Sequence, residues 1–231
     1  DYVVNENHVL SLVVVKTNTD SIPINILGKK YFKNDKIDIP ILEYTKLSKN
    51  SRDKLKGYKT RVEFYEKKIQ TNPYTIGGTL LYIKYIPYIY KCNSRTNRLQ
   101  LLAGVIDTYG ELNICTKNSY EIKFKLTNCR LIKDIKFVIR SLGFLCTSKK
   151  NKHKPYYKIH IFGNDLGDIP TKKYKIQNYS KYDENYLYTG IEIKCIGRDN
   201  YYGFEVDENH RFLLGDFTVT HNSTFLSDIM Y

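Results

Sequence analysis

The sequence predicts a β-rich domain that is interrupted by an inserted α+β unit, and three observations support this fold class. The first 15 residues, DYVVNENHVLSLVVV, alternate in polarity and are rich in valine, as expected for a strand and hairpin. Two segments in the middle of the chain carry apolar residues at helical spacing. From residue 185 to Asn222 the sequence is β-like again. A β segment, a helix-and-strand segment and a returning β segment indicate that one domain is inserted into another.

The elements follow in order along the chain. Residues 16–71 contain short β-like runs separated by lysine-rich turns. The segment RTNRLQLLAGVIDTYG, residues 95–110, predicts a helix, and Gly110 is a suitable residue to end it. The segment LNICTKNSYEIKFKLT, residues 112–127, then predicts two strands.

A second helix and a further strand are expected after these. The segment RLIKDIKFVIRSLGF, residues 130–144, has an amphipathic helical pattern that Gly143 ends. The segment KPYYKIHIFG, residues 154–163, predicts another strand. The middle of the chain is therefore expected to mix helices with a sheet.

The charge of the chain favours an acidic partner. The 231 residues carry a formal net charge of +13. Residues 112–184 hold most of it, with 16 Lys and Arg against 6 Asp and Glu. Such a balance suits a nucleic-acid partner, and a solvated basic surface is the alternative interpretation. An AT-rich genome would also raise the content of Lys, Tyr, Ile and Asn.

Several classes of protein are disfavoured by the composition. The five cysteines are odd in number and none has C-x-x-C spacing, which argues against a zinc site and against a secreted disulfide scaffold. No apolar run is long enough to span a membrane, and the first residues lack the pattern of a signal peptide. We expect an intracellular protein, and the absence of an initiator Met indicates a part of something longer.

The end of the chain carries a family resemblance. The segment YYGFEVDENHRFLLGDFTVTHN, residues 201–222, resembles the two C-terminal splicing blocks of inteins, which excise themselves from a host protein. It ends in the pair His221-Asn222, and Ser223 matches the first residue of the host. Near the start, VNENHVLSL is similar to the intein block that contains a conserved histidine, here His8. Asn5 stands where that block usually has Thr.

The resemblance implies a chemistry that these residue types can carry out. Asn222 can close its side-chain amide onto its own carbonyl carbon, which breaks the bond to Ser223; the attack is intramolecular and so benefits from proximity. His221 and His210 are the candidates for donating protons and hydrogen bonds. Ser223 would receive the upstream host segment, and His8 would act on the upstream scissile amide. His153 and His160 are expected to be ordinary surface or core residues, and splicing needs no cofactor.

A second resemblance lies inside the first predicted helix. LAGVIDTYG, residues 102–110, resembles the LAGLIDADG motif of homing endonucleases, and the resemblance implies that Ala103 and Gly104 allow close helix packing. In that family the eighth position is acidic and holds Mg²⁺ beside the DNA phosphates. Here it is Tyr109, which lacks the charge, while Asp107 corresponds to a position used for packing and capping. Gly110 completes the motif.

The resemblance also implies a degenerate enzyme that still contacts DNA. NPYTIGG, residues 72–78, resembles the opening of a first motif, but its acidic element is missing. Cutting is therefore expected to be lost, with no metal site, and Mg²⁺ would matter only if the endonuclease were active. Lys123, Lys125 and Lys158 lie on the predicted basic strands and are the expected DNA contacts, with binding expected to be weak.

Together these resemblances predict a mainly β, Hint-type splicing domain with an inserted α+β LAGLIDADG-type remnant. The splicing domain is expected at 1–66 and 185–222, the remnant at 67–184, and host sequence at 223–231. The partners would be the host segments, called exteins; STFLSDIMY fits the second half of a GKST phosphate-binding loop, which would make the host a P-loop ATPase. Two alternatives stay open: an active endonuclease that dimerises with one motif per chain, and a domain that performs C-terminal autocleavage only.

Overall fold

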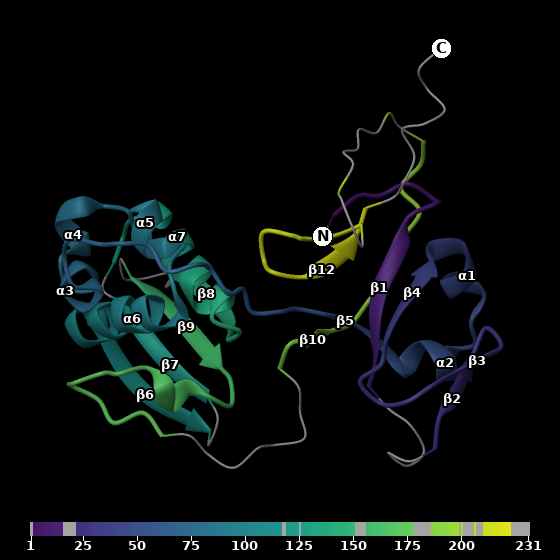
Figure 1. Cartoon of the computed structure of the whole chain (residues 1–231), viewed down its shortest axis with the longest axis horizontal. Helices are drawn as coiled ribbons and strands as arrows, with labels where there is room; N and C mark the ends of the chain where they lie inside the picture. The colour runs from purple at the N-terminus through teal and green to yellow at the C-terminus, as the bar shows by residue number, and fades with distance from the viewer. Residues whose placement is uncertain are drawn as a thin grey trace. The chain divides into compact units, whose positions relative to one another are not determined.

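The computed structural model describes residues 2–15, 22–116, 119–124, 126–150, 156–177, 186–198, 200, 206 and 210–222. The chain divides into two compact units. The first comprises Asp1–Lys59 and Tyr188–Tyr231, and the second comprises Thr60–Leu187. The sequence placed the corresponding boundaries at 66/67 and 184/185. Each unit contains helices and small antiparallel sheets, so the chain is mixed α/β (Figure 1).

The first unit is built around a sheet with the strand order β10-β5-β1-β4. Its helices and strands are β1 Val9–Val14, β2 Ile24–Ile26, β3 Lys29–Tyr31, β4 Lys36–Pro40, α1 Ile41–Lys46, α2 Lys49–Asp53, β5 Leu55–Tyr58, β10 Tyr188–Thr189, β11 Arg211–Leu213 and β12 Val219–His221. The valine-rich start of the chain forms the central strand β1, which is buried over nearly its whole length. It pairs with β4 in the register Leu12 to Ile37, and both of these side chains lie in the core of the unit.

Two short helices in this unit were not anticipated from the sequence. Helix α1 follows Pro40 directly, and α2 begins after Ser48, whose hydroxyl accepts a hydrogen bond from the Ser51 amide at 3.2 Å. A serine in this position satisfies one of the free amides at a helix start. Helices of five or six residues contain too few apolar positions to produce a recognisable period, which is why a β-like interpretation prevailed for this stretch.

The second unit packs helices against a four-stranded antiparallel sheet of order β6-β7-β9-β8. Its elements are α3 Pro73–Gly78, α4 Leu80–Ile83, α5 Tyr88–Lys91, α6 Arg95–Tyr109, β6 Gly110–Thr116, β7 Ser119–Phe124, α7 Cys129–Ser141, β8 Leu145–Lys150, β9 Tyr157–Phe162 and a 3₁₀ turn at Leu166–Asp168. The two predicted helices and the three predicted strands of this region are confirmed. Strand β8 was missed, because its polar end SKK gives little of the apolar alternation typical of a strand.

The two long helices have clear start and stop residues. The Ser94 hydroxyl caps α6 and the Asn128 side chain caps α7. Gly143 follows α7 with φ +88°, a left-handed conformation that glycine adopts without strain. The middle of α6, from Leu101 to Ile106, is buried on every residue, so α6 is the central helix of the unit.

Candidate functional site

His8 lies in the core of the first unit, just before β1. Its side chain is 4% exposed, and its Nε2 atom hydrogen-bonds the hydroxyl of Thr220 at 3.1 Å. Thr220 is in the middle of β12 and is 2% exposed. The two residues are 212 positions apart in the sequence. The contact therefore joins the block near the start of the chain to the strand that ends in His221.

Burial also changes the acid–base behaviour of His8. Desolvation in the core, with the charge of His221 as the second cause, lowers the pKa of His8 from 6.5 to about 4. His8 is consequently a neutral imidazole near neutral pH. A neutral imidazole can donate from one ring nitrogen and accept at the other, which suits its hydrogen bond with the Thr220 hydroxyl.

The other site residues are carried by the hairpin of β11 and β12. Arg211 pairs with His221 in this hairpin, and the pairing continues one residue further where the Asn222 amide donates to the His210 carbonyl at 2.5 Å. The imidazole centroids of His210 and His221 are 5.8 Å apart. His210 itself has a left-handed backbone, with φ +54°. The hairpin thus brings both histidines beside Asn222.

The carbonyl group of Asn222 is also held, by the side chain of His221. The Nδ1 atom of His221 lies 2.6 Å from the Asn222 carbonyl oxygen. Because a carbonyl oxygen only accepts hydrogen bonds, Nδ1 carries the proton in this pair. The N–H and the C=O of Asn222 are both fixed, and a donor points at the oxygen on which negative charge would develop if this carbonyl were attacked.

A second contact at this hairpin involves a residue that the sequence did not single out. The Arg211 guanidinium forms an ion pair with Asp38 of β4 at 2.6 Å, and the other carboxylate oxygen of Asp38 accepts from the Ser11 hydroxyl at 2.9 Å. Arg211 is one residue from His210. The ion pair therefore attaches the start of β11 to the central sheet of the unit.

Of the predicted splicing residues, the structure brings His8, His210, His221 and Asn222 into one site, while Ser223 and the tail 223–231 lie outside the described residues. Thr220 was missed: a lone threonine in a β-like run carries no signal of its own, and only its position beside His221 could have suggested it. His153 lies outside the described residues, and His160 lies on β9 of the second unit, where it contacts Glu121 at 2.9 Å.

In the second unit, Ala103 and Gly104 are buried in α6, where α3 packs closely against it. A Cβ atom at Gly104 would lie 2.0 Å from the Tyr74 carbonyl oxygen, and one at Gly77 would lie 2.3 Å from the Leu101 carbonyl oxygen. Such distances leave no room for a side chain. The two helices therefore approach backbone to backbone, with one glycine from each, and the segment that resembled a first motif supplies the partner helix.

The polar residues of the LAGLIDADG-like motif are committed to internal hydrogen bonds. Asp107 accepts from the Tyr74 hydroxyl at 2.9 Å and from the backbone amides of Lys172 and Lys173 at 2.6 and 3.2 Å. Tyr109 donates its hydroxyl proton to the Gly78 carbonyl and accepts from the Leu81 amide at 3.3 Å. Gly110 begins β6 in an extended conformation. Both side chains thus fasten α6 to neighbouring segments.

The sheet of this unit carries a row of lysines on the face opposite the helices. Strand register places Lys123, Lys158 and Lys149 side by side on β7, β9 and β8. They alternate with Ile122 and Ile159, which are buried in the core. Lys149 was not predicted, because β8 was missed, and Lys125 lies outside the described residues. Glu121 on the same face approaches Lys158 at 3.5 Å, so the charge of the row is partly balanced.

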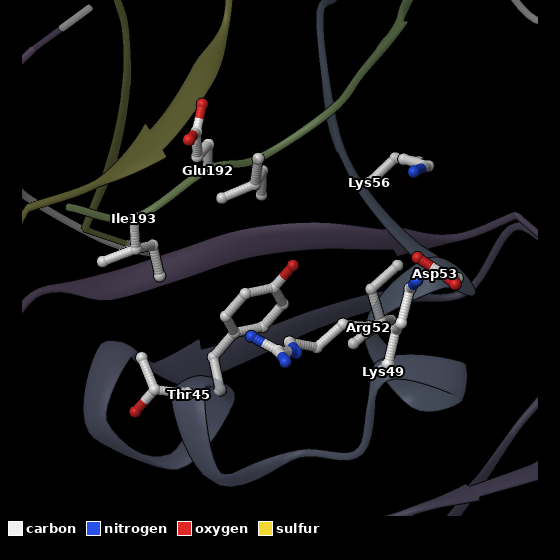
Figure 2. Close-up of a pocket in the computed structure, with 10 residues that line it drawn as sticks. Thr45, Lys49, Arg52, Asp53, Lys56, Glu192 and Ile193 are labelled. Atoms are coloured by element: carbon white, nitrogen blue, oxygen red, sulfur yellow. The ribbon is translucent and has the colours of Figure 1, made fainter.

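The described residues offer little to a metal or a small molecule. They contain no group of three or more His, Cys, Asp or Glu placed to hold a metal ion. A shallow groove of about 290 Å³ lies in the first unit between α1, α2 and residues 191–193. Figure 2 shows Arg52, Lys49 and Lys56 around it together with Asp53 and Glu192, a mixed set of charges that selects no ligand class.

Comparison with known proteins adds no family assignment. No protein-family model matches the chain, and no curated protein is significantly similar to it in sequence. In the part of the chain that the structure describes, no helix has both the length and the apolar character needed to cross a membrane.

Proposed function

We propose that the chain belongs to a protein-splicing element, in which Asn222 cyclises and releases the segment that begins at Ser223. One observation carries this proposal: the Asn222 amide donates to the backbone carbonyl of His210, and the Asn222 carbonyl accepts from the His221 imidazole. The intein resemblance had selected both histidines independently. The host segments on either side would be the partners, and Ser223 would be the host nucleophile.

The proposed step balances without a cofactor. The side-chain nitrogen of Asn222 attacks the carbonyl carbon of the same residue, and the carbon–nitrogen bond to Ser223 breaks. A five-membered succinimide forms. The attacking nitrogen loses one proton, and the amine of Ser223 gains one proton as it leaves. The His221 Nδ1 proton stabilises the tetrahedral oxygen. Because the reacting groups belong to one residue, the reaction is intramolecular and much faster than the same reaction between separate molecules.

The test uses the chain extended by a C-terminal tag. We expect slow release of the tag, with a succinimide or its hydrolysed product at residue 222 by mass spectrometry, and no release from Asn222→Ala. His221→Ala should slow release by roughly 10²–10³-fold, the usual cost of losing one oxyanion donor, and His210→Ala should also slow it. His160→Ala is the matched control, because its imidazole lies on β9 of the second unit. Equal release by Asn222→Ala and the unchanged chain would rule the proposal out.

We also propose that the second unit binds duplex DNA weakly and does not cut it. The row of Lys123, Lys158 and Lys149 on one sheet face supports binding, since such contacts to phosphates need no metal. The internal hydrogen bonds of Asp107 and the replacement of an acid by Tyr109 argue against cutting. The dimeric endonuclease alternative is disfavoured because α3 covers the Gly104 surface of α6.

The measurement is the affinity for a duplex of the rejoined host gene as the salt concentration is varied. Each lysine–phosphate contact should contribute about −0.9 to the slope of log K against log salt. Changing Lys123, Lys149 and Lys158 together to Gln should flatten that slope. The same charge change at the exposed Lys29, Lys30 and Lys46 of the first unit is the control. Equal slopes for the two triple variants would contradict the assigned surface, and a site-specific break made with Mg²⁺ would favour the endonuclease alternative.

A further inference from the structure

The hairpin that carries the proposed site has a limited backbone attachment. Among the described residues β11 and β12 form a sheet with each other, and a single isolated bridge joins Thr218 to Lys59. Lys59 directly follows β5 and is the last residue of the first unit before the chain enters the second. The position of the hairpin therefore depends strongly on side-chain contacts.

The Lys59 side chain gathers three acceptors at the hairpin turn. Its ammonium group forms an ion pair with the Asp216 carboxylate, lies 3.4 Å from the Asp216 carbonyl oxygen, and donates to the Thr218 hydroxyl at 2.8 Å. An ammonium group has three protons to donate, so these contacts can use its full capacity. The Lys59 side chain is 14% exposed, which makes this a largely desolvated interaction for the lysine.

The turn that Lys59 contacts contains a residue in an unfavourable backbone conformation. Phe217, between the two residues that Lys59 contacts, is buried and has φ +67°, a left-handed conformation that costs an L-residue of order 1 kcal/mol or more. The Asp216 carboxylate also accepts from the Thr218 amide at 3.1 Å. Contacts on both sides of Phe217 therefore hold the turn in a conformation that its sequence alone would not favour.

Asp216 is ionised at neutral pH and well below it. Burial would raise the pKa of this carboxyl, but the hydrogen bonds from Lys59 and Thr218 and the Lys59 charge outweigh it and lower the pKa to about 2. The ion pair is thus intact at any pH at which a histidine-assisted reaction would run.

We propose that Lys59 is a positioning residue for the cyclisation of Asn222, which acts by fixing the turn Asp216–Thr218 and with it the register of β12. Thr218 precedes the three-residue strand β12, and Asn222 follows that strand directly. A shift of the turn would move the Asn222 amide away from the His210 carbonyl and the carbonyl oxygen away from His221. An error of about 1 Å at a reacting centre can cost roughly 100-fold in rate.

This inference rests on the proposed function, and the same tagged chain tests it. Lys59→Met should slow tag release by roughly 10–100-fold, while Lys59→Arg, which keeps the charge and the donors, should restore most of the rate. Lys56→Met is the matched control, because Lys56 lies three residues earlier, on strand β5, and lines the groove of Figure 2 instead. Thr218→Val and Asp216→Asn remove single acceptors with little change of shape and should each slow release. The double variant Lys59→Met/Asp216→Asn should be no slower than Lys59→Met alone.

The outcomes separate the two proposals. If the unchanged chain releases no tag, the proposed function fails and this inference fails with it. If the unchanged chain releases the tag and Lys59→Met does so at the same rate, the inference alone is overturned. Slow release by Lys59→Met that Lys59→Arg does not rescue, or additive effects in the double variant, would also overturn it. Hydrogen exchange at the Leu12 amide shows whether Lys59→Met folds. If it does not fold, Thr218→Val and Asp216→Asn decide the question. Unchanged tag release by these two variants would overturn the inference, and slowed release would support it.

Discussion

At the scale of single residues, the buried His8 links acid–base chemistry to stability. Its low folded-state pKa of about 4 contrasts with 6.5 for an exposed histidine. Between these two pH values the unfolded chain binds a proton that the folded chain does not bind. The free energy of unfolding therefore falls as the pH falls from about 6.5 towards 4, and it is unaffected by His8 above that window. The depressed pKa of Asp216 acts in a separate window, below its ordinary value of 3.8.

The free energy of unfolding should therefore depend measurably on pH, and replacing His8 should weaken that dependence. Urea unfolding followed by the NMR signals of Leu12 and Ile39 should show stability decreasing between pH 6.5 and 4.5, by at most about 1.4 kcal/mol per pH unit from His8. His8→Gln cannot titrate and still offers Thr220 a hydrogen-bonding amide, so its curve should be flatter. Identical pH dependence in the two proteins would mean that His8 does not titrate as its burial implies.

At the scale of elements, the packing of α3 on α6 and the shape of the site hairpin decide what each segment can do. Small residues at Ala103 and Gly104 predicted a close helix contact, but not which segment provides it. Helix α3 has six residues, too few for a periodic pattern, and its role is visible only where the Tyr74 carbonyl meets Gly104. The contact does not depend on an acidic residue at position 109, because packing requires small residues and metal binding requires a carboxylate.

In the hairpin β11–β12, too, the residue types indicate a chemistry, while the fold decides whether the residues meet. Its residue types suggested proton transfer and cyclisation, since only certain side chains can perform those steps. Whether Asn222 pairs with His210 depends on strand register, and a slip of one residue would reverse the face of every side chain. The turn at Asp216–Thr218 and the Lys59 side chain set that register, and no local pattern reveals a contact across 157 positions.

At the scale of the whole molecule, the second unit is inserted between two paired strands of the first. Strand β10 pairs antiparallel with β5, with Tyr188 opposite Tyr58, so the chain leaves and re-enters the first unit at neighbouring points. Each unit also has its own hydrophobic core. Because paired residues in antiparallel strands lie about 5 Å apart, a turn of a few residues can bridge such a gap.

Removal of the second unit should therefore spare the site. A chain in which residues 60–187 are replaced by Asn-Gly should fold, keep the hydrogen bond between His8 and Thr220, and release a C-terminal tag within a few-fold of the full chain's rate. It should lose any binding to duplex DNA. Tag release and the NMR signal of the His8 ring provide the two measurements, and a folded but inactive protein would show that the site needs the second unit.

The sequence by itself determined the elements whose pattern is local: the two long helices with the glycines that end them, the strands with clear alternation, and the residue types able to support cyclisation at Asn222. Helical and strand periods arise from contacts among near neighbours, which any window of the chain contains. Only the tertiary structure decided that His8 hydrogen-bonds Thr220, that Lys59 forms an ion pair with Asp216, and that three lysines from separate strands form one row. These contacts depend on the path of the backbone between distant segments, and chain path is a property of the whole fold.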